Sequence, residues 1–517
     1  MSRTVVLGAA ILLAAACARP PAPVPVAPAA LASAGVDRAP TISDPEEYQD
    51  HGISAAMGEQ YFGTLGGGDP YATGMAYPVW LALVEAFPAQ LGGDLARFAS
   101  RFGLLVDPAR AQGPAALPIG FHLTTDPNTR VPFVVANCQL CHAERLRLPG
   151  GDRIVSGLGS THVRIHAYDG ALTQVARDPA FTTEAVLAAA NRAAREHELT
   201  WPDAVRLPIV RATVVALRAR ADGRAADAAR YASGLPGRVA TIESFAMAMN
   251  ARGAHVPLGG GATGWAKIPD VNGFPYRETL SWDGVGRGSP VALAAEADFA
   301  FGARPEWFET HRHIATSLYM YLAHFDRSLP YPGPVDARTA ERGRSVFEAK
   351  CSGCHGFYAP GGPQPRVRYR ERVVPQPVVG TDPAREEAVT PAFVQAANAI
   401  PLGRGVTTSA ATGGYVPPVL LGVWARGTYG HAGQWPSLEV LSRRPGERPR
   451  RFVVDVDGAY DLANLGLPWS EVRGGEPAAR GYLYDGEQPG YRVEGHEFLS
   501  NLPADDRRSV LEYLKTL

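Results

Sequence analysis

The sequence has almost no net charge, because 50 lysines and arginines face 51 aspartates and glutamates, which leaves a formal charge of -1. A chain without a basic excess does not attract nucleic-acid phosphates or an anionic membrane surface, so we expect neither as a partner. It also lacks any apolar run beyond the N-terminus that could span a bilayer. The 517 residues, 46% of them hydrophobic, suffice for two or more domains with separate cores.

The N-terminus has the pattern of an export signal. Arg3 is followed by the apolar run 5–13 and then by small residues that end at Cys17. This pattern predicts a signal peptide over residues 1–17. Small residues directly before Cys17 are typical of a lipobox, so we favour lipidation of Cys17 over ordinary cleavage, which would leave a soluble periplasmic protein. We expect the periplasmic or cell-surface side of the envelope, with a lipid anchor in the outer membrane as the membrane contact.

Cysteine is scarce, and the four cysteines after Cys17 all belong to two Cys-x-x-Cys-His motifs. Two thiols about one helical turn apart can add to the vinyl groups of a haem, and the histidine that follows can bind its iron. A zinc knuckle would need further ligands at finger-like spacing, and a redox dithiol has no use for the histidine. The motifs therefore predict two covalently attached haem c groups. The attachment residues would be Cys138, Cys141, Cys351 and Cys354, and the proximal iron ligands His142 and His355.

Composition divides the remaining chain into three parts. Residues 18–43 are rich in proline and alanine and predict an extended tether. The Pro/Gly cluster at 329–334 separates a haem domain at 44–330 from a cytochrome c-like haem domain at 331–517. Apolar residues at three- and four-residue spacing predict helices over 183–198, 203–220 and 306–325. No strand repeat is visible, so we expect a mainly α protein with long loops, whose N-terminal haem domain is enlarged by insertions.

Methionine is absent after the second motif, since the last of the six is Met320. The second haem therefore cannot take a thioether as its sixth ligand from the following residues, as small electron-transfer cytochromes do. Two histidines follow His355, each in a Gly-flanked loop. We expect His496 as the sixth ligand, with His431 as the alternative and Tyr429 as a remote one.

The first motif is preceded by the β-branched, proline-containing run 131–137, which predicts an extended segment rather than a helix. His162 and His166 follow the motif closely enough to fold back over its haem, as a ligand or as distal-side residues. The alternative is that both are ordinary polar loop residues. Trp265 and Trp282 are more often core aromatics than electron relays.

The second motif lies in sequence similar to class I cytochrome c. Asp336 can cap a helix that runs through Ala349, and Gly343 and Phe347 stand at that family's spacing before the motif. Residues 507–517 match its C-terminal helix, so the two helices should cross. The likeness covers residues 334 to 517 with a long insertion.

Beyond the motifs, the segments 267–269, 280–284, 429–433 and 495–498 resemble the dihaem bacterial cytochrome c peroxidase superfamily, and within it the rubber oxygenase-like branch. The resemblance implies one haem that handles peroxide or dioxygen and one that transfers electrons. In that branch the N-terminal haem is reactive and the C-terminal one is bis-histidine, which maps the extra ligand onto His496. The resemblance also allows a calcium ion between the domains.

Two functions follow as hypotheses. The first is an oxidoreductase of the dihaem peroxidase or oxygenase type, whose reactive haem is held by His142 while the haem at His355 relays electrons. The second is a non-catalytic electron-transfer cytochrome with two six-coordinate haems. Either would exchange electrons with a donor or acceptor protein in the cell envelope.

Overall fold

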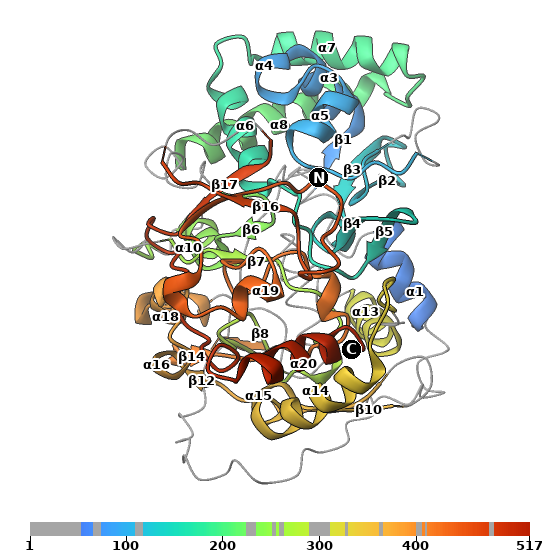
Figure 1. Cartoon of the computed structure of the whole chain (residues 1–517). Coiled ribbons are helices and arrows are strands. Elements are labelled where there is room, and N and C mark those ends of the chain that lie inside the picture. The colour runs from blue at the N-terminus through green and yellow to red at the C-terminus, as the bar shows by residue number, and fades with distance from the viewer. Residues whose placement is uncertain are drawn as a thin grey trace.

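A computed structural model of the whole chain was analysed (Figure 1). The structure describes residues 53–65, 74–108, 117–223, 234–250, 255–257, 263–288, 311–325, 329–360, 365–399, 406–408, 411–474 and 480–517. The predicted signal peptide, Cys17 and the predicted tether lie outside these ranges, as do residues 306–310 of the third predicted helix.

The fold is mixed α/β, so the prediction of a mainly α protein is wrong. About 42% of the described residues are helical and 15% lie in strands, and the strands form several small antiparallel sheets. Each strand is two to six residues long. Most of these segments are too short for a clear period-two pattern, so that only β3 was predicted, as the extended segment 131–137.

The helices account for most of the regular structure. The α-helices are α1 (Ala55–Gln60), α3 (Tyr77–Ala86), α4 (Pro88–Leu91), α5 (Leu95–Arg101), α6 (Ile165–Arg177), α7 (Thr183–Glu196), α8 (Asp203–Gly223), α10 (Thr241–Asn250), α13 (Arg312–His324), α14 (Ala337–Lys350), α15 (Ser352–His355), α16 (Gln376–Val379), α17 (Ala384–Glu387), α18 (Pro391–Ala397), α19 (Leu438–Leu441) and α20 (Ala504–Leu514). A π-helix, η2 (Tyr61–Leu65), continues α1, and the 3-10 helices are η3 (Cys138–Leu140), η4 (Phe274–Tyr276), η5 (Val423–Ala425) and η6 (Pro445–Glu447).

The strands pair only in twos and threes. The three-stranded sheets have the orders β1 (Met75–Ala76), β3 (Pro132–Ala136), β2 (Phe121–Thr125); β13 (Val406–Thr408), β9 (Gly286–Gly288), β8 (Thr279–Leu280); and β16 (Trp469–Glu471), β15 (Arg451–Val454), β17 (Tyr482–Asp485). The two-stranded sheets are β4 (Ala143–Leu148) with β5 (Gly151–Ser156), β6 (Arg238–Val239) with β7 (Ala266–Lys267), β10 (Phe357–Ala359) with β11 (Arg366–Arg368), and β12 (Val374–Pro375) with β14 (Gly414–Tyr415).

Helices predicted from apolar periodicity are present. The predicted helix 183–198 is α7, and the predicted helix 203–220 is α8. The third is α13 over the part that the structure describes. In α7, the Thr182 side chain caps the first turn by accepting from the backbone N–H of Ala185. Figure 1 shows α3 to α8 gathered at one end of the molecule, around one hydrophobic core that they share with β1 and β3.

A second core fills the opposite end and draws on both sides of the predicted boundary at 329–334. Leu146, Leu158 and Trp265 pack into the same cluster as Phe347 and Trp424. Strand β9 also pairs with β13 across this boundary. The division at 330/331 stays a prediction, but the two parts share a core. Within the described ranges, no helix is long and apolar enough to span a membrane.

The predicted crossing of the two helices around the second motif is confirmed. Asp336 caps α14 by accepting from the N–H of Thr339, and α14 packs against α20. A Cβ atom at Gly343 would overlap the Ser509 carbonyl and lie 2.9 Å from the Cβ of Tyr513. Glycine is therefore required for this close approach, and Phe347 packs beside it on Tyr513 with ring centroids 5.3 Å apart.

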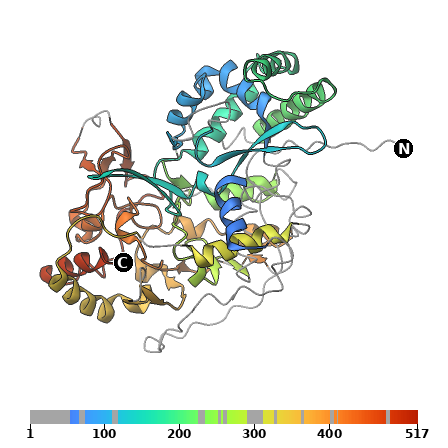
Figure 2. The same cartoon turned by 90° about the vertical axis from the view of Figure 1, so that its right-hand side faces the viewer.

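The same arrangement occurs a second time, between α1 and α13, which lie side by side in Figures 1 and 2. A Cβ at Gly58 would overlap the Ser317 carbonyl and lie 2.7 Å from the Cβ of Tyr321. Four residues after Gly58, Phe62 packs on Tyr321 with ring centroids 5.4 Å apart. Each half of the chain thus has a Gly-x-x-x-Phe helix that crosses a Ser-x-x-x-Tyr helix.

Replacing Gly343 by alanine should weaken the α14–α20 crossing. Overpacking at a close helix contact costs roughly 1–3 kcal/mol, so we expect the free energy of unfolding to fall by that amount in a urea titration followed by tryptophan fluorescence. Gly170, in α6, is the matched control, because a Cβ there meets nothing within 4 Å. Gly170→Ala should be neutral or stabilise by up to about 1 kcal/mol. Equal losses in both variants would contradict the packing argument.

Candidate functional site

The first motif begins where a strand ends. The predicted extended segment before it is β3, and η3 then carries the first cysteine. Asn137 connects the two elements, because its side chain accepts from the N–H of Gln139 and donates to the Gly63 carbonyl at 3.0 Å. Gly63 belongs to η2, so this bond joins the motif to the helix that begins the first half.

The second motif begins where α14 ends. Cys351 is the C-cap residue of α14, and α15 begins at the next residue. The N–H groups of Cys354 and His355 both donate to the Cys351 carbonyl, each at 3.0 Å. The two thiols are therefore held about one turn apart, as attachment to a single planar group would require.

Both motif histidines are oriented by a proline carbonyl. The Nδ1 atom of His142 lies 3.0 Å from the carbonyl oxygen of Pro269, and that of His355 lies 2.9 Å from Pro418. A carbonyl can only accept, so Nδ1 carries the proton and Nε2 keeps its lone pair. Loss of hydration lowers the pKa of each ring to about 4. Both rings are therefore neutral near pH 7, which is the form that binds a metal.

His496 lies opposite His355. Their ring centroids are 6.1 Å apart, with an angle of 52° between the planes. Metal–imidazole bonds are about 2.0 Å long, so two imidazoles that share one metal ion have centroids roughly 6 Å apart. The Nδ1 atom of His496 is buried without a hydrogen-bond partner among the described residues. Desolvation, and then the neighbouring His355, lower the pKa of His496 to about 3.

The loop that carries His496 is held in an uncommon conformation. Its backbone has φ of 49°, which few residues other than glycine adopt, and its N–H donates to the Val379 carbonyl at 2.6 Å. The buried guanidinium of Arg448 donates to the carbonyls of Val493 and Gly495, on the N-terminal side of His496. Hydrogen bonds to the backbone around His496 therefore fix the position of its ring.

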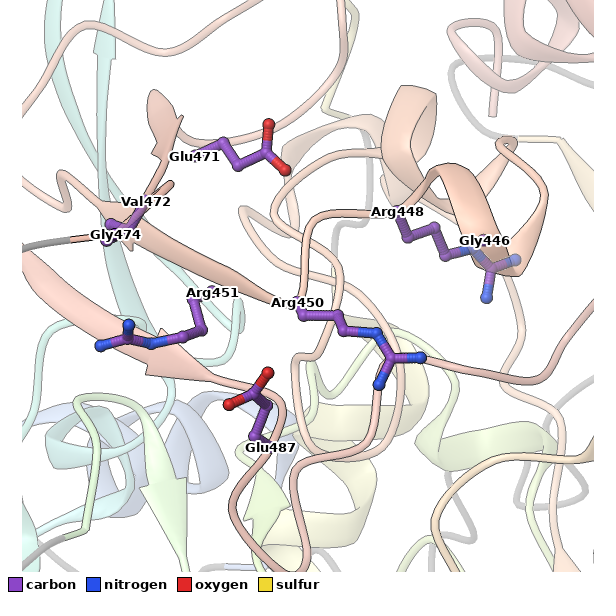
Figure 3. Close-up of a pocket in the computed structure, with 8 residues that line it drawn as sticks. All are labelled: Gly446, Arg448, Arg450, Arg451, Glu471, Val472, Gly474 and Glu487. Carbon is purple, nitrogen blue, oxygen red and sulfur yellow. The ribbon is translucent and has the colours of Figure 1, made fainter.

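Arg448 also lines a cavity of about 440 Å³ (Figure 3). In this view the side chains of Arg450 and Arg451 extend to opposite sides of Glu487. Acidic side chains accompany both arginines, because Arg450 pairs with Glu494 and Arg451 pairs with Asp485. We assign this cavity no function.

The alternative sixth ligands occupy other contacts. His431 stacks on Tyr415 with centroids 4.4 Å apart, and desolvation, followed by Arg385, lowers its pKa to about 3. The hydroxyl of Tyr429 donates to the Val423 carbonyl at 2.9 Å. Neither side chain is among the ring contacts of His355 in the described ranges, whereas His496 is.

The distal-side candidates of the first motif make buried contacts with other residues. His162 Nδ1 lies 2.7 Å from a carboxylate oxygen of Glu144, with both side chains at most 4% exposed. His166 Nε2 accepts from the N–H of Ala240 at 3.0 Å. Among the described residues, the aromatic ring in contact with His142 is that of Phe62, at 6.5 Å between centroids and an angle of 40°.

Sequence patterns did not identify several residues of this site. Phe62 could have been found from the Gly-x-x-x-Phe spacing that it shares with Gly343 and Phe347. Pro269 lies in one of the short segments already noted, but no pattern shows that its carbonyl meets a histidine more than a hundred residues earlier. Trp265 packs between His166 and Tyr491, as a core aromatic does.

The cofactor prediction requires correction. Among the described residues, no group of three or more His, Cys, Asp or Glu side chains could hold a metal ion, and none of the four motif cysteines belongs to such a group. The cofactor prediction, two covalently bound haem c groups with calcium as a further possibility, is contradicted to this extent, and calcium, which takes six to eight oxygen ligands, is abandoned.

Comparison with known proteins gives partial relatives. No protein-family model matches the sequence. The uncharacterized protein y4iJ of Sinorhizobium fredii (strain NBRC 101917 / NGR234) is 26% identical over 247 residues, 36% of this chain and 40% of that protein. The uncharacterized protein y4iM of the same strain is 29% identical over 249 residues, 38% of this chain and 53% of that protein. The chain thus spans about half, or less, of the relatives that it matches.

The buried pair of Glu144 and His162 predicts a pH-dependent contribution to stability. Burial alone would lower the pKa of His162, but the charge and hydrogen bond of Glu144 outweigh it and raise that pKa. The contribution should be complete below the unfolded pKa of about 6.5 and decline as the pH rises through the folded value. Glu144→Gln should cost about 3–5 kcal/mol of unfolding free energy at pH 6 and less at alkaline pH.

The exposed pair of Glu85 and His197, 3.3 Å apart, is the control. Glu85→Gln should change the unfolding free energy by less than about 1 kcal/mol. Urea titrations at several pH values measure both differences. A cost for Glu144→Gln that did not vary with pH would refute the ion-pair interpretation.

Proposed function

We propose that this chain is an exported c-type cytochrome that acts in redox chemistry, with an electron-transfer centre at His355 and a reactive centre at His142. The observation that carries this proposal is the difference between the two motif histidines. His355 faces a second histidine at 6.1 Å, whereas the ring that contacts His142 within the described ranges is the phenyl ring of Phe62. Two strong axial ligands favour electron transfer, and an iron without a second one can react.

The motif residues fit a haem c at each site. Thioether bonds would form at Cys138, Cys141, Cys351 and Cys354. When bound, haem supplies one-electron chemistry at iron and, at an open position, reaction with peroxide or dioxygen. The chain itself holds the proximal rings neutral and oriented through Pro269 and Pro418, and it holds His496 through its backbone.

Phe62 gives the first centre an apolar neighbour. Its ring is 2% exposed and packs in a cluster with Leu318 and Leu322, beside the partly buried Cys138. A phenyl ring supplies no ligand atom, so Phe62 would leave its side of the centre without a protein ligand, and the substrate class that we propose for it is a small oxidant such as peroxide or dioxygen. Electrons would come from a donor protein of the cell envelope, where the exported chain would be anchored at Cys17.

The test is spectroscopic. The full chain, with its leader, is produced in a bacterial host that attaches haem c, and covalently bound haem is quantified by its pyridine derivative. Ferric protein is then examined by electron paramagnetic resonance before and after addition of peroxide. We expect two haems per chain, one low-spin and one high-spin, with peroxide changing only the second. Absence of covalent haem would refute the proposal, and two low-spin, ligand-inert haems would leave only electron transfer.

Removal of His496 tests the assignment of the electron-transfer centre. His496→Ala should convert one low-spin haem to a high-spin form that binds added imidazole, because its iron loses an axial nitrogen. His431→Ala is the matched control, since it removes a buried histidine of the same domain that stacks on Tyr415 rather than facing His355. An unchanged low-spin signal in His496→Ala, or a loss in His431→Ala, would reject the assignment.

A further inference from the structure

A buried ion pair lies between the two motif histidines. Oδ2 of Asp270 is 2.9 Å from Nε of Arg426, and both side chains are 8% exposed. Nη2 of Arg426 also donates to the backbone carbonyls of Val419 at 2.5 Å and Leu421 at 3.2 Å. The guanidinium is thus fixed at one end by a carboxylate and at the other by the segment that follows Pro418.

Each end of this pair adjoins the carbonyl that orients one motif histidine. The carbonyl that accepts from His142 belongs to the residue directly before Asp270. The carbonyl that accepts from His355 belongs to the residue directly before Val419, to which Arg426 donates. The two rings are therefore connected through the Asp270–Arg426 pair. The connection consists of hydrogen bonds and of the peptide bonds between Pro269 and Asp270 and between Pro418 and Val419.

We propose that the Asp270–Arg426 pair connects the two redox centres and biases a single electron toward the centre at His355. This inference rests on the proposed function, because it requires an iron at each motif histidine. The pair is a positioning element: it contacts neither iron, and it acts through the carbonyls and through its charges.

The pair has a direction. Its carboxylate belongs to the residue that directly follows Pro269, whose carbonyl orients His142. Its guanidinium donates to the carbonyl of Val419, which directly follows Pro418, whose carbonyl orients His355. The negative end therefore faces the first centre and the positive end faces the second. Buried charges are screened less than exposed ones, so this polarity should reach the irons.

The polarity fixes the sign of the effect on reduction. A negative charge beside the first centre stabilises its oxidised, more positive state, and a positive charge beside the second destabilises that state. When the chain holds one electron, the exchange oxidises one iron by one electron and reduces the other, with no proton or further reactant. The equilibrium should lie toward reduction at His355, which leaves the first centre oxidised until a second electron arrives.

The experiment measures both reduction potentials by optical titration of the full-length protein with dithionite. Asp270→Asn should raise the potential of the high-spin centre more than that of the low-spin centre. Arg426→Gln should lower the potential of the low-spin centre more. Each substitution should shift the equilibrium of a single electron between the two centres about tenfold toward the first. This shift corresponds to a change of about 59 mV in the difference between the two reduction potentials. Shifts of equal sign and size at both centres would overturn the proposal.

Two further variants separate charge from damage to the fold. Arg426→Lys keeps the positive charge but not the multiple hydrogen bonds, so it should restore most of the low-spin potential that Arg426→Gln loses. Asp283→Asn is the matched control, because Asp283 forms an equally buried pair with Arg385 at 2.8 Å and neither acts on the pKa of a motif histidine. A Lys variant that behaves like the Gln variant, or a control that shifts the potentials as Asp270→Asn does, would refute the charge mechanism.

The two proposals fail in different ways. If the protein contains no covalent haem, there is no potential to titrate and the proposed function itself is wrong. If both haems are present and the potentials do not respond with opposite signs to Asp270→Asn and Arg426→Gln, the proposed function stands and only the role of the ion pair is rejected.

Discussion

The hydrogen bond from a histidine Nδ1 to a proline carbonyl is the interaction on which the rest of this site depends. It occurs twice, at His142 and His355, and it determines which ring nitrogen carries the proton and where the other one points. Because the acceptors are backbone atoms, the loops around Pro269 and Pro418 must be placed accurately for the rings to be placed at all. Their neighbours, Asp270 among them, then come close to the histidines as well.

A similar helix crossing accompanies each of the two sites. In each half, a glycine lets a short helix cross a partner helix that carries a serine and a tyrosine, and a phenylalanine four residues later packs on that tyrosine. The halves differ in the elements that lie between this helix and the motif. In the first, the strands β1 to β3 and helices α3 to α5 lie between this helix and the motif, whereas in the second the motif follows the helix directly.

Sequence patterns predicted the parts of the fold that rest on local rules. The capping of α14 by Asp336, the crossing at Gly343 and the helices α7 and α8 all followed from spacing within one helix. The small sheets did not, because strands of two to six residues show no period. The absence of methionine after the second motif left His431 and His496 as candidate sixth ligands, and the structure places His496 opposite His355. Phe62 and the Asp270–Arg426 pair were not found, because their contacts join segments far apart in the sequence.

The crossing of α1 and α13 has a consequence for how the protein assembles. Its two helices lie near opposite ends of the first half, whereas Cys138 and His142 lie between them. Contacts between distant segments form late, because the chain must first close a long loop. Because the chain is synthesised from its N-terminus, its first motif is exposed well before α13 is available to complete the surrounding structure. Until α13 packs on α1, the structure around the first motif is incomplete.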